Sequence, residues 1–165
     1  MNKKRVLSLL TASILSVSIL AACGDKKEEP KKDDKKPAAT ATYKDGKYTA
    51  EFDKADERGW KSFVEIEVKD GKIAKATFDD KKEDGTLKSK DEGYNKTMKE
   101  QGKKTSPAEY TKTFAESLVK NQDPEKIDTV SGATHSYDSY KKLATGLLKE
   151  KAAKGETSTL VMPSK

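Results

Sequence analysis

A charged stretch at residues 24–42 most strongly limits what this chain can fold into. It contains no large apolar residue and consists mainly of Lys, Asp, Glu, Pro and Ala. Such a segment cannot bury enough apolar surface to offset the entropy lost on ordering, so we expect a disordered tether. A folded core must then come from the roughly 110 residues that follow, which suffices for one small domain.

The segment before this stretch has the pattern of a lipoprotein signal. Three basic residues at 3–5 precede an apolar run at 6–20 that is too short and too polar for a settled membrane span. Residues 20–23, Leu-Ala-Ala-Cys, match the lipobox that signal peptidase II cuts before a cysteine. We therefore predict a signal peptide at 1–22 and a lipid on Cys23 that anchors the protein at the extracytoplasmic face of the cell membrane. An uncleaved N-terminal anchor is the alternative.

The charge and the rare residues exclude several functions. The chain has a net charge of +6, but residues 43–165 hold 25 basic and 23 acidic residues, so the predicted domain is nearly neutral. It has no electrostatic footprint for nucleic acid. Cys23 is the only cysteine and His135 the only histidine, which leaves too few ligands for a zinc site. We predict no metal, no conventional catalytic acid–base set and a monomer.

The first half of the domain has strand patterns. Residues 48–52 alternate weakly, and residues 63–68 alternate polar and apolar side chains. Asp70-Gly71 is a strong hairpin signal, and residues 73–78 form the returning strand. Because the second face of these strands is polar, we expect a small antiparallel sheet that is covered on one face only.

The second half has helix patterns, so the fold class is α+β. Residues 91–101 carry a short apolar stripe, and Ser106-Pro107-Ala108-Glu109 is a capping box at the start of a helix that Asp123-Pro124 ends. Apolar residues recur with helical spacing over 136–150, which predicts a helix that begins near Ser136. The predicted organisation is a signal peptide at 1–22, a lipidated cysteine and tether at 23–42, a domain at 43–153, and a tail at 154–165 in which residues 159–162 form a short strand or fray.

Residues 128–134, Asp-Thr-Val-Ser-Gly-Ala-Thr, form a small-residue turn directly before the predicted last helix. Glycine and alanine let a ligand approach the backbone, and a helix start offers unpaired amides to an anion. The other interpretation is a Ser-rich turn that only caps the helix.

This turn also resembles the Asp-x-x-Ser/Thr-Gly-Ala-Thr/Ser flavinylation signature of FMN-binding domains. Further segments look like those of bacterial single-domain FMN-binding lipoproteins: Asp45-Gly46-Lys47-Tyr48, Gly59-Trp60-Lys61, residues 68–73, Glu92-Gly93-Tyr94-Asn95 and Ser106-Pro107-Ala108. The domain is similar, too, to the FMN-bearing subunits of Rnf and sodium-pumping quinone reductase complexes and to a surface flavoprotein of Gram-positive extracellular electron transfer.

The resemblance implies a covalent cofactor and an enzyme that attaches it. Thr134 would carry FMN through a phosphoester, and Asp128, Ser131, Gly132 and Ala133 would form the recognition sequence. The modifying enzyme would be an ApbE-type flavin transferase, which uses FAD and Mg²⁺ and releases AMP. The expected partners are this transferase, a membrane quinone-linked oxidoreductase and an external electron acceptor.

Four further residues are candidates for contact with the flavin. His135 would touch the phosphate or flavin, or it is an exposed residue at a helix start. Trp60 would stack on the isoalloxazine, or it packs at the edge of the core. Tyr94 and Met98 share a helix face and would line the pocket, or they are core residues.

We therefore expect a lipid-anchored electron carrier rather than an enzyme with a substrate of its own. Two alternatives stay open from the residues: a non-redox surface lipoprotein that binds a ligand or adheres, and a protein that binds FMN without a covalent bond.

Overall fold

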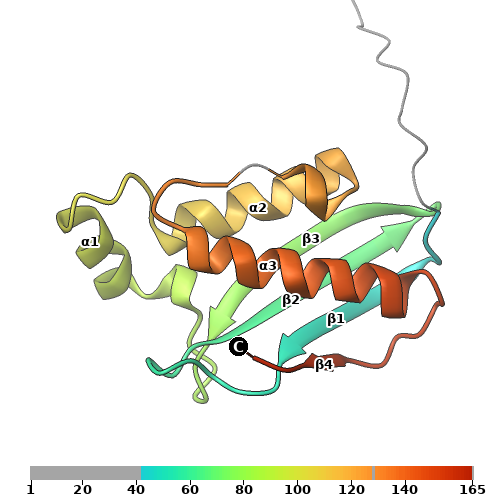
Figure 1. Cartoon of the computed structure of the whole chain (residues 1–165), viewed down its shortest axis with the longest axis horizontal. Coiled ribbons are helices and arrows are strands. Elements are labelled where there is room, and N and C mark those ends of the chain that lie inside the picture. Colours follow the sequence, from blue (N-terminus) through green and yellow to red (C-terminus); the bar gives the residue numbers. More distant parts are fainter. Residues whose placement is uncertain (1–41, 128, 165) are drawn as a thin grey trace, which may run out of the picture. The chain divides into compact units, whose positions relative to one another are not determined.

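The computed structural model describes residues 42–127 and 129–164. The predicted signal peptide, Cys23, almost all of the predicted tether and Asp128 lie outside the described residues. The elements below belong to one α+β domain, shown in Figure 1.

Three strands form the antiparallel part of the sheet. β1 (Gly46–Phe52) pairs with β2 (Lys61–Lys69), and β2 pairs with β3 (Lys72–Lys81). The predicted hairpin turn is present: Asp70 and Gly71 have φ values of 52° and 72°. Positive φ at both central residues matches the right-handed twist of the two strands. The predicted strands and the hairpin turn between the second and the third are confirmed here.

A fourth strand makes the sheet mixed. β4 (Leu160–Met162) lies in the segment for which the sequence left a strand or a frayed tail open, and it runs parallel to β1. The strand order is β3-β2-β1-β4. The amide of Lys44 donates to the carbonyl of Ala152 at 2.9 Å, so the helical segment ends beside the start of β1. The chain can then return only in the direction of β1, which accounts for the parallel pairing.

The helices that the sequence predicts are present. The α-helices are α1 (Glu92–Glu100), α2 (Pro107–Asn121) and α3 (Thr134–Leu147). The short helical turns are η1 (Lys88–Lys90), η2 (Pro124–Lys126) and a π-helical turn, η3 (Leu148–Ala152), that continues α3. The capping box at the start of α2 is formed as predicted. α3, however, begins at Thr134 instead of Ser136, because Thr134 and His135 are exposed and lie outside the apolar pattern that predicted the helix.

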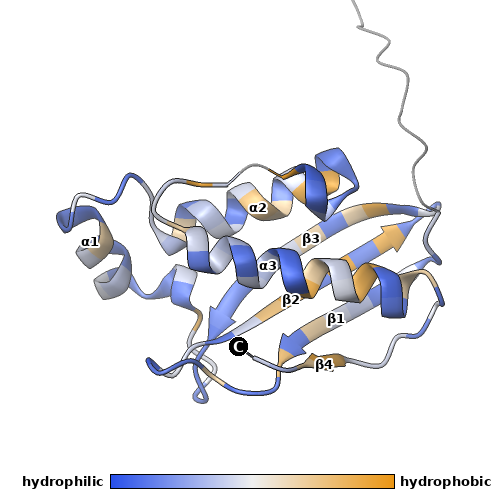
Figure 2. Cartoon of the chain, viewed as in Figure 1, coloured by the Kyte–Doolittle hydropathy of each residue, from blue (hydrophilic) through white to orange (hydrophobic). Residues whose placement is uncertain are grey.

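The hydrophobic core lies between one face of the sheet and the two long helices. α2 packs against β3, and α3 packs against β1 and β2, so both helices cover the same face (Figure 1). Figure 2 shows the hydrophobic residues of the strands under helices whose visible sides are mostly hydrophilic. The rings of Phe114 and Tyr140 stack at 5.6 Å in this core, and both residues are fully buried. The covered face and the helices on it agree with the sequence prediction.

Candidate functional site

The small-residue turn ends in the first turn of α3. Gly132 has a φ of +89°, a left-handed backbone that favours glycine. The amide of Ala133 donates to the carbonyl of Val130 at 2.9 Å, which closes the turn. Ala133 is buried and occupies the N-cap position of α3. Thr134 is therefore the first helical residue, and its side chain is exposed.

α3 begins without a side-chain cap, unlike the two other α-helices of the described residues. Asp91 caps α1 by accepting from the amide of Tyr94, and Ser106 with Glu109 forms the capping box of α2. Ala133 has no side-chain oxygen, and the first turn of α3 holds no acidic residue. The first amides of the helix thus keep their positive dipole end free for an anion.

The start of α3 lies on the wall of a cavity of about 830 Å³. Its size falls within the range of about 300–1,000 Å³ that is typical of ligand and cofactor pockets. The wall comes from the end of β1 and the loop after it, the starts of β2 and α3, the end of β3, η1 and α1. The cavity brings together seven of the residues that the sequence proposed: Trp60, Tyr94, Met98, Gly132, Ala133, Thr134 and His135.

Two proposed residues are not in this group. Ser131 is exposed in the turn and does not line the cavity. Asp128 lies outside the described residues. His135 is exposed at the second position of α3, beside Thr134.

An aromatic pair forms one side of the cavity. The rings of Trp60 and Tyr94 meet edge to face with centroids 6.0 Å apart. Trp60 is only 4% exposed, so it both packs at the edge of the core and lines the cavity. The two interpretations of Trp60 therefore do not exclude one another. Flat aromatic surface of this kind suits a planar ring system.

A tight loop holds Trp60 in this place. A single oxygen of Asp56, Oδ1, accepts from the amide of Arg58 at 2.9 Å and from that of Trp60 at 2.8 Å. The Arg58 guanidinium donates to the hydroxyl of Tyr94 at 3.3 Å, which ties this loop to α1. Gly59 has a φ of +80°, as the bend requires.

The floor of the cavity is the polar end of the sheet. Along the helix-facing side of β2 and β3, the apolar pair Val64–Phe78 is followed by the polar pair Ser62–Asp80. The Ser62 hydroxyl donates to one carboxylate oxygen of Asp80, and the Lys88 ammonium lies 3.0 Å from the other. The side chains of Lys88 and Asp80 are only 9% and 5% exposed.

Sequence reasoning missed this buried ion pair. The available signal was the pair of acidic residues, Asp79 and Asp80, at the end of a strand whose pattern otherwise places apolar residues inside. The Lys88 ammonium also lies over the rings of Trp60 and Tyr94, at 5.6 and 5.0 Å from their centroids. The aromatic pair and the ion pair thus form one continuous wall.

A buried tyrosine lies behind the start of α3. Tyr110 is 2% exposed, lines the cavity and is in hydrogen-bonding contact with Ser136. Desolvation by burial raises the pKa of the Tyr110 phenol far above its usual value, although the Ser136 contact lowers it. The phenol therefore stays protonated and uncharged at physiological pH.

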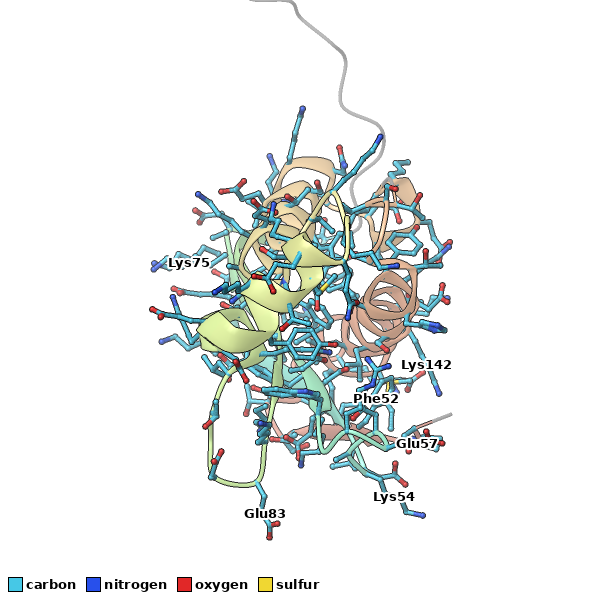
Figure 3. The ribbon with its side chains drawn as sticks, turned by 90° about the vertical axis from the view of Figure 1, so that its left-hand side faces the viewer. Phe52, Lys54, Glu57, Lys75, Glu83 and Lys142 are labelled. Atoms are coloured by element: carbon cyan, nitrogen blue, oxygen red, sulfur yellow. The ribbon has the colours of Figure 1, made fainter. Side chains whose placement is uncertain are left out.

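The mouth of the cavity carries charges of both signs. Figure 3 shows Phe52, Lys54, Glu57 and Lys142, the last of them on α3, on the same side of the domain. All four line the cavity. The Lys142 ammonium lies 5.2 Å from the ring centroid of Phe52. Ser164, near the end of the chain, also lines this mouth.

The comparisons with known proteins identify the family. A family model described as the FMN-binding domain matches residues 59–149, more than half of the chain. The chain belongs to the FMN-binding domain family. It is 32% identical over 116 residues to the 15 kDa lipoprotein of Treponema pallidum, a match that covers 70% of this chain and 81% of that protein. A crystal structure of a Clostridium perfringens protein is 36% identical, with a TM-score of 0.70, and covers 74% of this chain and 99% of the other.

The residues of the cavity fit FMN. The uncapped start of α3 suits a phosphate, the Trp60–Tyr94 wall suits an isoalloxazine ring, and polar groups on the floor and mouth suit its heteroatoms and ribityl chain. The matched range, 59–149, contains the two aromatic residues and the turn before α3.

None of the helices in the described part of the chain combines the length and the apolar character needed to cross a membrane. Within residues 42–127 and 129–164, no group of three or more His, Cys, Asp and Glu side chains is placed to hold a metal ion.

Proposed function

We propose that this protein is a membrane-anchored, extracytoplasmic flavoprotein that carries FMN covalently on Thr134 and shuttles electrons from a membrane oxidoreductase or the quinone pool to an external acceptor. When bound, FMN supplies the electron chemistry, since it accepts and releases up to two electrons. The protein supplies the anchor, the position of the ring and its electrostatic surroundings.

The observation that carries the proposal is the location of Thr134. It is exposed in the first turn of an uncapped helix and lies on the wall of the same cavity as Trp60 and Tyr94. A phosphate attached to its hydroxyl would lie at the positive end of the α3 dipole, where a negative charge is stabilised. The same attachment would leave the ring within reach of the aromatic wall.

The neighbours of Thr134 have separate tasks in this proposal. Gly132 and Ala133 keep side-chain bulk away from the phosphate and set the bend that exposes the hydroxyl. Asp128 and Ser131 belong to the sequence that a flavin transferase recognises. The transferase would join FMN to the Thr134 oxygen from FAD with Mg²⁺, and AMP would leave.

Anchoring outside the cytoplasm explains why FMN would be attached by a covalent bond. The lipobox ending at Cys23 and the resemblance to a protein named as a lipoprotein support attachment to the membrane. Outside the cytoplasm, an FMN that dissociated would be lost by dilution. A covalent bond removes that dissociation equilibrium.

Intact mass measurement tests the covalent bond. The full chain is produced with and without a flavin transferase. We expect a gain of one FMN less one water only when the transferase is present, no gain in Thr134→Ala, and partial or full recovery in Thr134→Ser, which restores the hydroxyl.

Three outcomes would contradict the assignment. A gain that persists in Thr134→Ala would move the bond to another residue. A yellow protein that shows no mass gain and loses its colour on denaturation would establish non-covalent FMN. A colourless protein under all conditions would favour the non-redox surface lipoprotein.

A further inference from the structure

A second groove lies between α2 and the edge strand β3. It has a volume of about 730 Å³ and shares no residue with the cofactor cavity. Lys75, one of its residues, lies on the side of the domain opposite to Lys142 in Figure 3. Its apolar lining comes from both elements and from the loop after β3: Ala76, Phe78, Leu87, Ala108, Ala115 and Val119.

β3 has an open edge along this groove. It is the terminal strand of the sheet, and within the described residues no strand pairs with its outer side between Lys75 and Asp79. Two outward amides beyond the ends of this stretch are hydrogen-bonded. The amide of Ile73 donates to the side chain of Gln122 at 2.8 Å, and the amide of Asp80 donates to the carboxylate of Asp79 at 2.8 Å.

The bonded amide of Asp80 fixes the direction of the others, because a shift in the pairing register between Ile73 and Lys75 separates Ile73 from this part of the strand. Backbone groups of an antiparallel strand alternate between its two neighbours. Asp80, Phe78 and Ala76 face the helices and share one phase, so the N–H and C=O groups of Ala76 and Phe78 point outward into the groove. An open stretch of about five residues spans roughly 16 Å.

The rim of the groove is basic. Its exposed basic side chains are those of Lys75, Lys90, Lys112 and Lys120. Among the residues that line the groove, Glu116 has the single exposed carboxylate. The Glu116 carboxylate lies 3.7 Å from the Lys112 ammonium, and the Glu67 carboxylate lies 3.8 Å from that of Lys75, so the two acids neutralise only part of this charge. Asp79, the other acid in the lining, is buried and accepts from the hydroxyl of Ser89.

We propose that this groove binds an extended, acidic polypeptide segment of a partner protein, which adds to β3 as a fifth strand. Its backbone pairs with Ala76 and Phe78, small apolar side chains enter the groove under α2, and acidic side chains meet the lysines of the rim. A second copy of this chain is a poor occupant, because the same basic rim would face itself.

The groove also lies close to the cofactor cavity through η1. Asp79 and Ser89 face the groove, whereas their chain neighbours Asp80 and Lys88 face the cavity. A segment docked on β3 therefore lies one residue away from the buried ion pair of the cofactor wall. The docking proposal itself does not depend on bound FMN.

Fluorescence anisotropy with three synthetic probes tests the proposal on the full chain. The probes are an octapeptide of alternating glutamate and valine, its N-methylated analogue, and the corresponding lysine–valine peptide. We expect only the first to bind. The combined variant Lys75→Glu, Lys112→Glu and Lys120→Glu weakens it by about tenfold or more, since three charge contacts turn repulsive.

A matched control variant replaces three exposed lysines elsewhere, Lys47, Lys104 and Lys149, with glutamate. It should leave binding of the acidic peptide unchanged. Ala76→Pro removes one outward amide, a change that edge strands tolerate, and should abolish binding. Hydrogen exchange at the amides of Ala76 and Phe78 gives a second readout, because the bound acidic peptide should protect both.

Four results would overturn the proposal. Equal binding of the N-methylated peptide would leave charge attraction alone, as on an anionic lipid surface. An equal loss of affinity in the control variant would show that the lysines of the rim do not bind the peptide specifically. Self-association that the rim variant abolishes would assign the groove to a second copy. Absence of binding by the acidic peptide would leave the groove without a ligand of this class.

Discussion

Lys88 is a charged side chain that folding has taken almost entirely out of water. Its ammonium is 3.0 Å from Asp80 and over the rings of Trp60 and Tyr94. A buried pair is costly to break because the remaining charge has no water around it. The pair also lines the cavity, where under the proposed function a local charge would influence the energy of adding electrons to FMN.

We predict that Lys88→Met destabilises the protein by about 3–5 kcal/mol, because it leaves Asp80 buried without its counterion. The double variant Lys88→Met with Asp80→Asn should recover much of this loss. Urea denaturation of the FMN-free protein measures both. In the FMN-loaded protein, Lys88→Met should lower the reduction potential and Asp80→Asn should raise it, which spectroelectrochemistry detects.

Lys82 is the matched control. Its ammonium also lies over the Trp60 ring, at 4.6 Å from the centroid, but its side chain is 42% exposed. Lys82→Met should change stability by less than about 1 kcal/mol. A loss as large as that of Lys88→Met would show that the aromatic contact, and not the buried pair, carries the effect.

Individual residues also show the limit of sequence reasoning at this scale. The sequence selected Trp60 as the sole tryptophan but left core packing and cofactor contact as alternatives. The structure shows that Trp60 is buried, at 4% exposure, and that it also lines the cavity, so core packing does not exclude contact with a cofactor. Burial and lining depend on neighbours that are distant in sequence, such as Tyr94, and no local pattern contains them.

At the scale of elements, α3 lacks the cap that α1 and α2 have. An N-cap serine, threonine or aspartate usually contributes about 0.5–2 kcal/mol. Ala133 contributes no such bond. A single substitution that supplied such a cap would therefore stabilise the start of α3. Stabilising residues of this kind are commonly missing where a site must remain free for a ligand.

We predict that Ala133→Ser stabilises the FMN-free protein by about 0.5–1 kcal/mol, because the hydroxyl caps an amide of α3. The same bond competes with the phosphate, so attachment of FMN by the transferase should become slower. Thermal denaturation and the rate of mass gain measure the two effects.

Ser106→Ala is the matched control for this helix prediction. It removes the cap of α2, whose capping box is complete, and should destabilise the protein by about 1 kcal/mol. Since Ser106 does not line the cavity, the rate of FMN attachment should not change. Faster attachment in Ala133→Ser would contradict the proposed competition.

At the scale of the whole domain, the last strand extends the sheet and brings the end of the described chain to the mouth of the cavity. β4 pairs with β1, and the amide of Ser164 then donates to Asp53 at 2.7 Å. The Lys142 ammonium donates to the carbonyl of Pro163 at 2.6 Å. The end of the described chain thus joins the loop after β1 to α3.

We predict that deletion of residues 160–165 destabilises the protein by about 2–3 kcal/mol, through loss of the half-buried Leu160 and Met162. It also opens the edge of β1, which favours self-association. Denaturation and sedimentation measure the two effects. Val161→Lys, a change at a side chain that is 57% exposed, is the control and should be neutral. Unchanged stability after deletion would contradict this role of β4.

Local signals in the sequence determined most of the elements. The alternation at 63–68, the Asp70-Gly71 turn and the capping box at Ser106 act between residues a few positions apart, so each was predictable. The turn before Thr134 was identified for the same reason, and a family resemblance gave it a chemical meaning. The exact start of α3 was missed by two residues because Thr134 and His135 are exposed and add nothing to the apolar spacing of the helix.

Only the tertiary structure decided what lies around that turn. It brings Trp60 from a loop, Tyr94 from α1, Asp80 from β3 and Lys88 from η1 to one cavity with Thr134. It also made β4 parallel and left one edge of β3 open. Strand pairing and burial join residues across long stretches of chain, and the energy of such contacts has no local signature in the sequence. The sequence determined a small α+β domain with a small-residue turn before its last helix, and the packing of distant segments placed that turn on the wall of a cavity.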